Sequence, residues 1–233
     1  MYRQEQQVIE IEDFAAGGTR RALHPDPELY GSGWGDPETI PHLRSVLKTL
    51  QATLDAETRD SDGYVVEIGC GGGRWTRFIG RHRQQSGNRY KLAITDATEV
   101  AFELTAYQFA KMGLDPTEKE LICLDGRFEL DRPADVVFSF DVFVHFDDGL
   151  MMSYLDSIAA ALRPGGKLLV SFACEFGPDT LGWERSDEWF NYVMRDGLFR
   201  ADVRERLERD FTWGDVQQMP SGYGTAFVVL TRR

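Results

Sequence analysis

The feature that most constrains the fold is a glycine-rich hinge between a short apolar run and the start of a helix. Residues 65–68 read Val-Val-Glu-Ile, and glycines follow at Gly69, Gly71, Gly72 and Gly73. Glycine adopts positive φ angles at little cost and leaves the backbone bare. A strand, hinge and helix of this kind let a ligand lie directly against the main chain at a helix N-terminus. The hinge therefore predicts a cofactor-binding loop.

The spacing of these glycines excludes two common nucleotide-binding loops. A dinucleotide fingerprint needs Gly-x-Gly-x-x-Gly, but counting from Gly69 the third glycine position holds Arg74. A P-loop needs a following Gly-Lys-Ser/Thr, which the sequence lacks. Glu67 is a second unusual feature, because a carboxyl group buried in an apolar strand must be hydrogen-bonded.

Apolar runs and helical segments alternate along the rest of the chain. We expect further strands at residues 91–95, 121–124, 135–140, 167–172, 211–216 and 225–231. We expect helices at about residues 39–56, 75–85, 99–112 and 149–162, with a Pro-Gly-Gly turn after the last one. This alternation predicts βαβ crossovers and a mostly parallel sheet in an α/β fold.

Several expected strands end in residues suited to ligand binding. Gly69, Asp96, Asp125 and Asp141 stand at strand ends, which meet along one edge where ligands bind in open α/β sheets. The two oxygens of Asp96 could accept hydrogen bonds from two adjacent ribose hydroxyls. The alternative is that Asp96 is the N-cap of the following helix, a role that aspartate fills well.

The form Glu-x-Gly-x-Gly-x-Gly, together with this strand order, resembles the class I S-adenosylmethionine-dependent methyltransferases from about residue 65 to the C-terminus. The resemblance implies a three-layer Rossmann-like methyltransferase fold, with a mostly parallel seven-stranded sheet whose last strand is antiparallel. It implies S-adenosyl-L-methionine as cofactor and S-adenosyl-L-homocysteine as product. We expect an N-terminal extension and lid over residues 1–60 and a methyltransferase core over residues 61–233, within a single domain overall.

The resemblance also assigns roles at the expected site. The residues expected to bind the cofactor are Glu67, Gly69, Cys70, Gly71, Gly73, Trp75, Asp96, Ala97, Asp125, Gly126, Ser139 and Phe140. Glu67 would order the region around the amino end of the cofactor, and Asp125 would meet the adenine amino group. Ser139 and Phe140 would lie beside its methionine end. Asp125-Gly126 is also an ordinary turn dipeptide, so that alternative stays open.

His145 and Asp141 are the candidate catalytic residues. An alcohol is a poor nucleophile, and a base that titrates near neutrality can help by taking its proton. The alternatives are a His145 packed at a helix start and an Asp141 that caps a helix or holds a substrate hydroxyl. Asp147, Asp148 and Glu175 compete for the role of base. Aspartates at 141, 147 and 148 also suggest a magnesium site, but spacing alone is weak support and we assign no metal ligands.

The acceptor is the least constrained part of the prediction. Aromatic-rich segments at residues 30–38 and 176–199 are expected to build a lid over the substrate. Residues 34–38, 71–76 and 139–145 resemble bacterial methyltransferases of sugar and glycan modification. We therefore expect O-methylation of a small molecule or a sugar or glycan intermediate. The alternatives are N-methylation, O-methylation of a non-sugar natural product, and a non-catalytic cofactor-binding partner subunit.

Composition excludes several other classes of protein. The net charge of −12 argues against a nucleic-acid partner. No apolar run approaches the length of a membrane span and no signal peptide is evident, so we expect a cytoplasmic protein without a membrane partner. The three cysteines fit neither a metal site nor a disulfide framework. The arginines between residues 195 and 209 alternate with acids, which predicts a solvated helix face. The sequence leaves the oligomeric state open.

Overall fold

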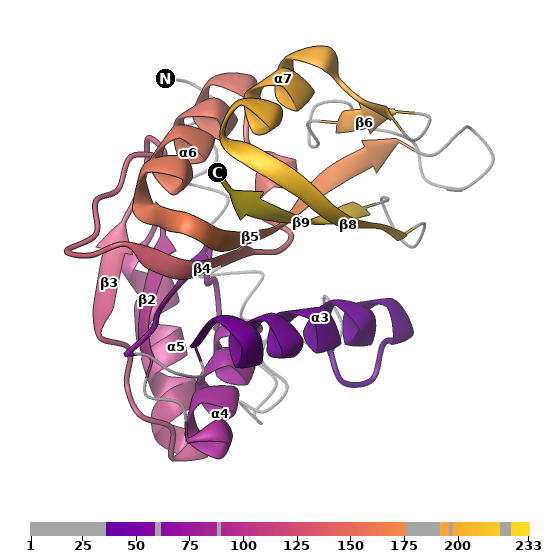
Figure 1. The fold of residues 1–233 in the computed structure, drawn as a ribbon. Coiled ribbons are helices and arrows are strands. Elements are labelled where there is room, and N and C mark those ends of the chain that lie inside the picture. Colours follow the sequence, from indigo (N-terminus) through magenta and orange to yellow (C-terminus); the bar gives the residue numbers. More distant parts are fainter. Residues whose placement is uncertain (1–35, 59–61, 88–89, 176–191, 196–197, 220–224) are drawn as a thin grey trace. The chain divides into compact units, whose positions relative to one another are not determined.

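The computed structural model describes residues 36–58, 62–87, 90–175, 192–195, 198–219 and 225–233 (Figure 1). The chain divides into two compact units, one ending at Leu124 and one beginning at Asp125. Residues 30–35 and 176–191, which the sequence assigned to a lid, lie outside the described residues. The expected division into residues 1–60 and 61–233 stays a prediction.

Three parallel strands form the sheet of the first unit. They are β1 (Tyr64–Ile68), β2 (Lys91–Asp96) and β3 (Lys119–Ile122), in the order β3-β2-β1. β1 is buried along its whole length, as is usual for a parallel strand covered on both faces. β3 ends earlier than expected because Ile122 pairs with Asp96, which is the last residue of β2.

The helices expected in the first unit are confirmed. They are α3 (Pro41–Thr58), α4 (Thr76–Ser86) and α5 (Glu99–Met112). The Thr98 hydroxyl caps α5 by accepting from the Ala101 amide, and Gly113 ends it in the left-handed conformation. α4 lies beside α5 (Figure 1). The two helices approach closely because Gly80 of α4 has no side chain: a Cβ there would stand 2.8 Å from the Phe109 ring.

Two ion pairs join the segment before α3 to α4. Asp36 pairs with Arg77 at 3.1 Å, and Glu38 pairs with Arg81 at 3.1 Å. Arg77 is only 6% exposed. Burial lowers the pKa of its guanidinium, and the Asp36 carboxylate opposes that shift. The residues that precede α3 are therefore anchored by a charge that is costly to leave unpaired.

The second unit contains a mixed sheet. Its main strands are β4 (Ala134–Ser139), β5 (Leu162–Glu175), β8 (Phe211–Met219) and β9 (Thr225–Arg232). β4 runs parallel to β5, whereas β9 is antiparallel to both β5 and β8. The expectation that the last strand is antiparallel is confirmed.

β5 is longer than the predicted strand at residues 167–172. The turn expected at residues 163–166 lies within the first residues of β5. There the pairing of β5 with β4 is irregular, and its register shifts between Ala134 and Val136. At its other end, β5 pairs with a short parallel strand, β6 (Tyr192–Arg195), which in turn pairs with β7 (Leu198–Phe199). Neither β6 nor β7 was predicted, because both are short and fall in the segment that we had assigned to the lid.

The helical elements of the second unit are η4 (Phe143–His145), α6 (Asp148–Ala161) and α7 (Ala201–Asp210). The predicted helix over about residues 149–162 is confirmed. The Phe146 ring stacks on Tyr154 of α6 at 4.6 Å, and Phe143 meets Phe172 of β5 edge to face at 5.7 Å. These aromatic contacts hold η4 and the residue after it against α6 and β5. No described helix combines the length and the apolar character needed to cross a membrane.

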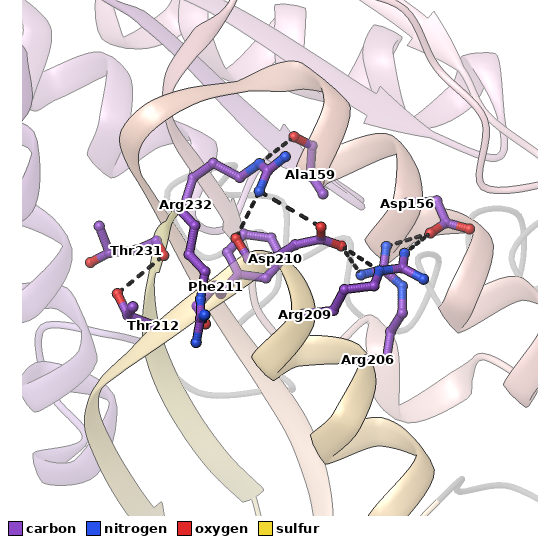
Figure 2. Close-up of polar contacts among 10 residues, drawn as sticks. Asp156, Ala159, Arg206, Arg209, Asp210, Phe211, Thr212, Thr231 and Arg232 are labelled. Atoms are coloured by element: carbon purple, nitrogen blue, oxygen red, sulfur yellow. Dashed lines mark hydrogen bonds and ion pairs between the residues drawn. The ribbon is translucent and has the colours of Figure 1, made fainter.

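A charged network lies between α6 and α7 (Figure 2). Arg206 of α7 is 8% exposed and pairs with both Asp156 and Asp210. Arg232 of β9 donates to the Asp210 carbonyl oxygen at 2.9 Å. The predicted solvated helix face is therefore wrong for Arg206. The tertiary contact with α6 buries this residue, and the paired aspartates compensate its charge.

Candidate functional site

The glycine loop after β1 adopts a conformation that requires glycine. Gly69, Gly71 and Gly73 have φ angles of 72°, 50° and 82°, a left-handed region that is strained for other residues. The amides of Gly69 and Cys70 donate to the Thr95 carbonyl oxygen at 2.9 and 3.0 Å. The loop therefore turns sharply away from β1 while it stays tied to β2.

Gly71 and Gly73 have different surroundings in the loop. A Cβ at Gly71 would meet nothing within 4 Å, whereas a Cβ at Gly73 would lie 3.1 Å from the Thr105 hydroxyl oxygen. Gly71 therefore borders open space, and Gly73 is packed against α5. A backbone that borders open space suits a cofactor lying directly on the loop.

The structure places Asp96 beside the loop with its carboxylate oriented by main-chain amides. Oδ2 accepts from the Gly71 amide and Oδ1 from the Ala97 amide, both at 2.8 Å. The Cys70 thiol lies 3.8 Å from Oδ2. A carboxylate has about four acceptor directions, so these two amide bonds do not exhaust it. The side chain that caps α5 belongs to Thr98 rather than to Asp96.

Burial and hydrogen bonding act in opposite directions on Asp96. The side chain is 6% exposed. Burial raises its pKa, and backbone hydrogen bonds from Gly71, Ala97 and Thr98 limit that rise. The same amides that orient the carboxylate therefore also favour its ionised form, which is the better acceptor for hydroxyl groups.

Glu67 is a buried acid with unused hydrogen-bonding capacity. It is 2% exposed, and its Oε2 has no hydrogen-bond partner among the described residues. Burial, with a smaller contribution from Asp96, raises the pKa of Glu67 to about 8, although a hydrogen bond with Thr76 opposes the shift. Glu67 is therefore largely protonated at neutral pH. A buried oxygen without a partner is costly, so this carboxyl group is suited to receive a donor from a ligand or an ordered water.

The remaining predicted residues of the first unit belong to the same cluster. Burial and the neighbouring acids Asp96 and Glu67 raise the pKa of the Cys70 thiol, which keeps it protonated. Trp75 is buried, with the Arg74 guanidinium 5.6 Å from the centre of its ring. The first unit thus brings together Glu67, Gly69, Cys70, Gly71, Gly73, Trp75, Asp96 and Ala97.

Asp125 and Gly126 form a turn at the start of the second unit. Asp125 Oδ1 accepts from the Arg127 amide at 3.0 Å, and the Asp125 carbonyl oxygen accepts from Ser153 at 2.7 Å. A Cβ at Gly126 would lie 2.8 Å from the Tyr154 amide nitrogen. Both residues therefore have a local structural role, and their contact with adenine stays a prediction.

The end of β4 carries a strained aspartate. Ser139 and Phe140 are buried, and the Phe140 ring lies 6.0 Å from Phe227. Asp141 follows with a φ of 60°, and its amide donates to the Ser171 hydroxyl at 2.7 Å. A non-glycine residue in this region costs about 1–2 kcal/mol. Such strain is concentrated at functional sites, so the observation favours a functional role for Asp141.

His145 ends η4 with an exposed side chain. Two of its competitors as base have other partners: Asp147 caps α6 by accepting from the Leu150 amide at 2.8 Å, and Asp148 pairs with Arg200 at 2.9 Å. In contrast, His82 is buried between Tyr90 and Asp55 in the first unit. No group of three or more histidine, cysteine or acidic side chains within the described residues could hold a metal ion.

Unfolding experiments at Asp141 would measure the strain directly. We expect Asp141→Gly to be more stable than Asp141→Ala by about 1–2 kcal/mol, because only glycine adopts this φ freely and both variants lack the carboxylate. Urea unfolding of the two variants gives the difference. The control is Glu103 in α5, where alanine should be the more stable replacement by about 1 kcal/mol. Equal stabilities at position 141 would contradict the strained conformation.

Two residues of α5 that the sequence analysis did not identify support the loop. Gln108 donates through Nε2 to the Gly72 carbonyl oxygen, and Thr105 contacts Gly73. Both polar side chains are buried on the same helix face as Ala101, Phe102 and Phe109. The sequence does place two polar residues on the apolar face of this helix, which indicates that they have buried partners. It does not show that these partners are residues of the glycine loop.

The family follows from a match over most of the chain. Residues 38–211 match the family model described as a methyltransferase domain. The chain belongs to this methyltransferase family. It is an S-adenosylmethionine-dependent methyltransferase, so the predicted activity and cofactor are confirmed.

Solved methyltransferase structures share the fold of this chain. The N-methyltransferase NodS from Bradyrhizobium japonicum WM9, in complex with S-adenosyl-L-homocysteine, is 15% identical with a TM-score of 0.62, covering 94% of this chain and 99% of its own. Magnesium protoporphyrin IX methyltransferase from Synechocystis PCC 6803, with bound S-adenosylmethionine, is 17% identical with a TM-score of 0.61, covering 97% and 96%. The predicted Rossmann-like methyltransferase fold is confirmed.

The same fold also occurs in a protein described by a different reaction. The (4+2)-cyclase SpnF is 13% identical with a TM-score of 0.58, covering 79% of this chain and 80% of its own. No curated protein sequence matches this methyltransferase significantly. The acceptor therefore has to be argued from the residues of the site.

Proposed function

We propose that this methyltransferase transfers the methyl group of S-adenosylmethionine to a hydroxyl group of a small molecule or of a sugar or glycan intermediate. The observation that carries this proposal is the exposed imidazole of His145, which follows the strained Asp141 at the end of β4. A hydroxyl acceptor benefits from a base that titrates near neutrality, and histidine is the side chain that does so.

Most of the residues that would hold the cofactor belong to the first unit; Asp125, Gly126, Ser139 and Phe140 of the second unit remain predicted contacts. Gly71 offers bare backbone beside open space, and Asp96 offers oriented acceptors for ribose hydroxyls. Glu67 has a buried oxygen with no partner among the described residues, which suits the amino end of the ligand or a water bound to it. When bound, the cofactor supplies a methyl group on a sulfonium. The observed residues fit this ligand because they combine open backbone with acceptors.

The second unit supplies the candidate catalytic residues. Methyl transfer is an in-line displacement, so positioning of the acceptor accounts for most of the acceleration. In our proposal His145 accepts the hydrogen bond from the acceptor hydroxyl and takes the proton that this hydroxyl loses, while Asp141 holds a neighbouring hydroxyl of the acceptor. Of the competing acids, Asp147 caps α6 and Asp148 pairs with Arg200.

Two alternatives remain. N-methylation is the first, since the structurally similar NodS is an N-methyltransferase, and a nitrogen acceptor would need less help from a base. The second is O-methylation of a natural product that is not a sugar. The fold does not decide between these possibilities, since it also occurs in a cyclase.

Transfer of label from methyl-labelled S-adenosylmethionine into a host-cell extract tests the proposal. After incubation with the protein, the extract is divided into metabolite, glycan, protein and RNA fractions. We expect label in the metabolite or glycan fraction, in a bond that resists mild acid and base as an ether does. The Asp96→Ala variant is the matched control and should give less label when the cofactor is limiting, because it should bind the cofactor about tenfold more weakly.

Other outcomes would point to the alternatives. Label on nitrogen would mean that the methyl acceptor is an amine and not a hydroxyl group. Label in protein or RNA would overturn the proposed substrate class.

A further inference from the structure

Gln108 contacts the cofactor loop from the side of α5. It is 2% exposed, and its amide nitrogen donates to the carbonyl oxygen of Gly72. Its Oε1 is also buried and has no hydrogen-bond partner among the described residues. The side chain is therefore held in an apolar setting where only one half of its amide is satisfied. A buried amide with an unsatisfied half is unfavourable, and loss of the bond to the loop would leave its nitrogen unsatisfied as well.

The loop depends on such a bond because its own sequence gives it little rigidity. Glycine loses more conformational freedom on ordering than any other residue, and fixing one backbone residue costs about 1–2 kcal/mol. Other contacts anchor the neighbouring amides: Gly71 donates to Asp96 at 2.8 Å, and Gly73 donates to the Cys70 carbonyl oxygen at 2.9 Å. Gln108 adds an anchor for a carbonyl group between these two amides.

Thr105 supports the same loop one helical turn before Gln108. Its hydroxyl would stand 3.1 Å from a Cβ at Gly73, so α5 packs tightly against this part of the loop. Asp96 and α5 therefore hold different groups of the loop: Asp96 binds the amide of Gly71, and α5 holds Gly72 and Gly73. Removing the α5 contacts would leave the loop attached but less ordered.

We propose that Gln108 is a positioning residue that holds the glycine loop in its cofactor-accepting conformation before the cofactor arrives. The benefit is preorganisation: the loop is ordered when the protein folds, so binding does not have to supply that free energy. This inference rests on the proposed assignment of residues 69–73 as the cofactor loop. It does not depend on the acceptor.

The test compares two glutamines whose side-chain amides each donate to a backbone carbonyl oxygen, one in the loop and one outside it. Gln108→Met removes the amide and keeps a similar volume. The control is Gln84→Met. Gln84 donates to the Gly113 carbonyl oxygen at 3.0 Å, and this bond lies at the far end of α5 from the loop. We expect Gln108→Met to weaken binding of S-adenosyl-L-homocysteine by about tenfold in calorimetry, and Gln84→Met to leave it unchanged.

Amide hydrogen exchange of the ligand-free protein separates positioning from general destabilisation. We expect the amide protons of Gly71 and Gly73 to exchange faster in Gln108→Met, while those of β1 and β2 keep their wild-type protection. Faster exchange throughout the first unit would mean a purely structural role and would overturn the inference. Unchanged affinity for S-adenosyl-L-homocysteine would overturn it as well.

A failed loop assignment gives a different result. If Asp96→Ala also leaves the affinity unchanged, the cofactor does not bind at this loop and the proposed cofactor residues are wrong. If Asp96→Ala weakens binding and Gln108→Met does not, only the positioning role of Gln108 is lost. Should Gln108→Met fail to fold, Gln108→Leu offers a second apolar replacement for the same measurements.

Discussion

Asp96→Ala should weaken the binding of S-adenosyl-L-homocysteine by about tenfold or more, because the hydrogen bonds that the ribose hydroxyls donate to a charged acceptor are lost. Calorimetry with the purified protein measures this affinity, and the substrate that accepts the methyl group does not have to be known. The variant also removes the partner of the Gly71 and Ala97 amides. The loss alone therefore does not separate a contact with the ribose from support of the loop.

A ligand without the 2′-hydroxyl separates these two contributions. Wild-type protein should bind the 2′-deoxy analogue of S-adenosyl-L-homocysteine several-fold more weakly than the parent, whereas Asp96→Ala should bind the two ligands equally. The pair of ligands and the pair of proteins form a double-mutant cycle, whose coupling term reports the contact itself. Glu103→Ala, which removes an exposed acid of α5, is the control and should behave like the wild type. Equal discrimination by wild type and Asp96→Ala would rule out the ribose assignment.

His145→Ala should lower turnover about 10²-fold if the imidazole is the general base. Affinity for the cofactor should stay unchanged, because His145 is not among the residues that are predicted to hold the cofactor. The measurement is the rate with the acceptor identified by the labelling experiment, over a range of pH. Loss of the base should also remove the fall of the rate on the acidic side of the profile.

His42→Ala is the matched control for this experiment. His42 is a half-buried histidine of α3, and its replacement should leave both turnover and the pH profile unchanged. A loss of less than about fivefold in His145→Ala would assign His145 to packing or to a minor contact. That result, combined with an amine product, would favour the N-methylation alternative.

The sequence predicted the elements whose structure depends on residues that are close together along the chain. Helix α5 matches its predicted bounds because Thr98 and Gly113 are capping residues whose preference is local. The glycines at 69, 71 and 73 all have positive φ angles, as their residue type allows. Asp96 lies beside the loop as predicted, because it ends the parallel strand that pairs with β1.

The predictions that failed concern contacts between distant parts of the chain. Arg206 was expected on a solvated face, but α7 packs on α6 and buries it against Asp156 and Asp210 (Figure 2). β6 was not expected because its pairing with the end of β5 joins segments that share no local signal. In both cases the decisive interaction is absent from the local sequence.

The sequence by itself thus determined the α/β class, the glycine loop and the residues that follow the strands, because glycine conformations, helix caps and apolar periodicity act over a few residues. Only the tertiary structure decided that Gln108 supports the loop, that Glu67 keeps an unpaired buried oxygen among the described residues, and that Asp141 is held in a left-handed conformation next to Ser171. Burial and hydrogen bonding between distant residues depend on how the helices pack on the strands. Those contacts set the pKa of Glu67, the order of the loop and the strain at Asp141.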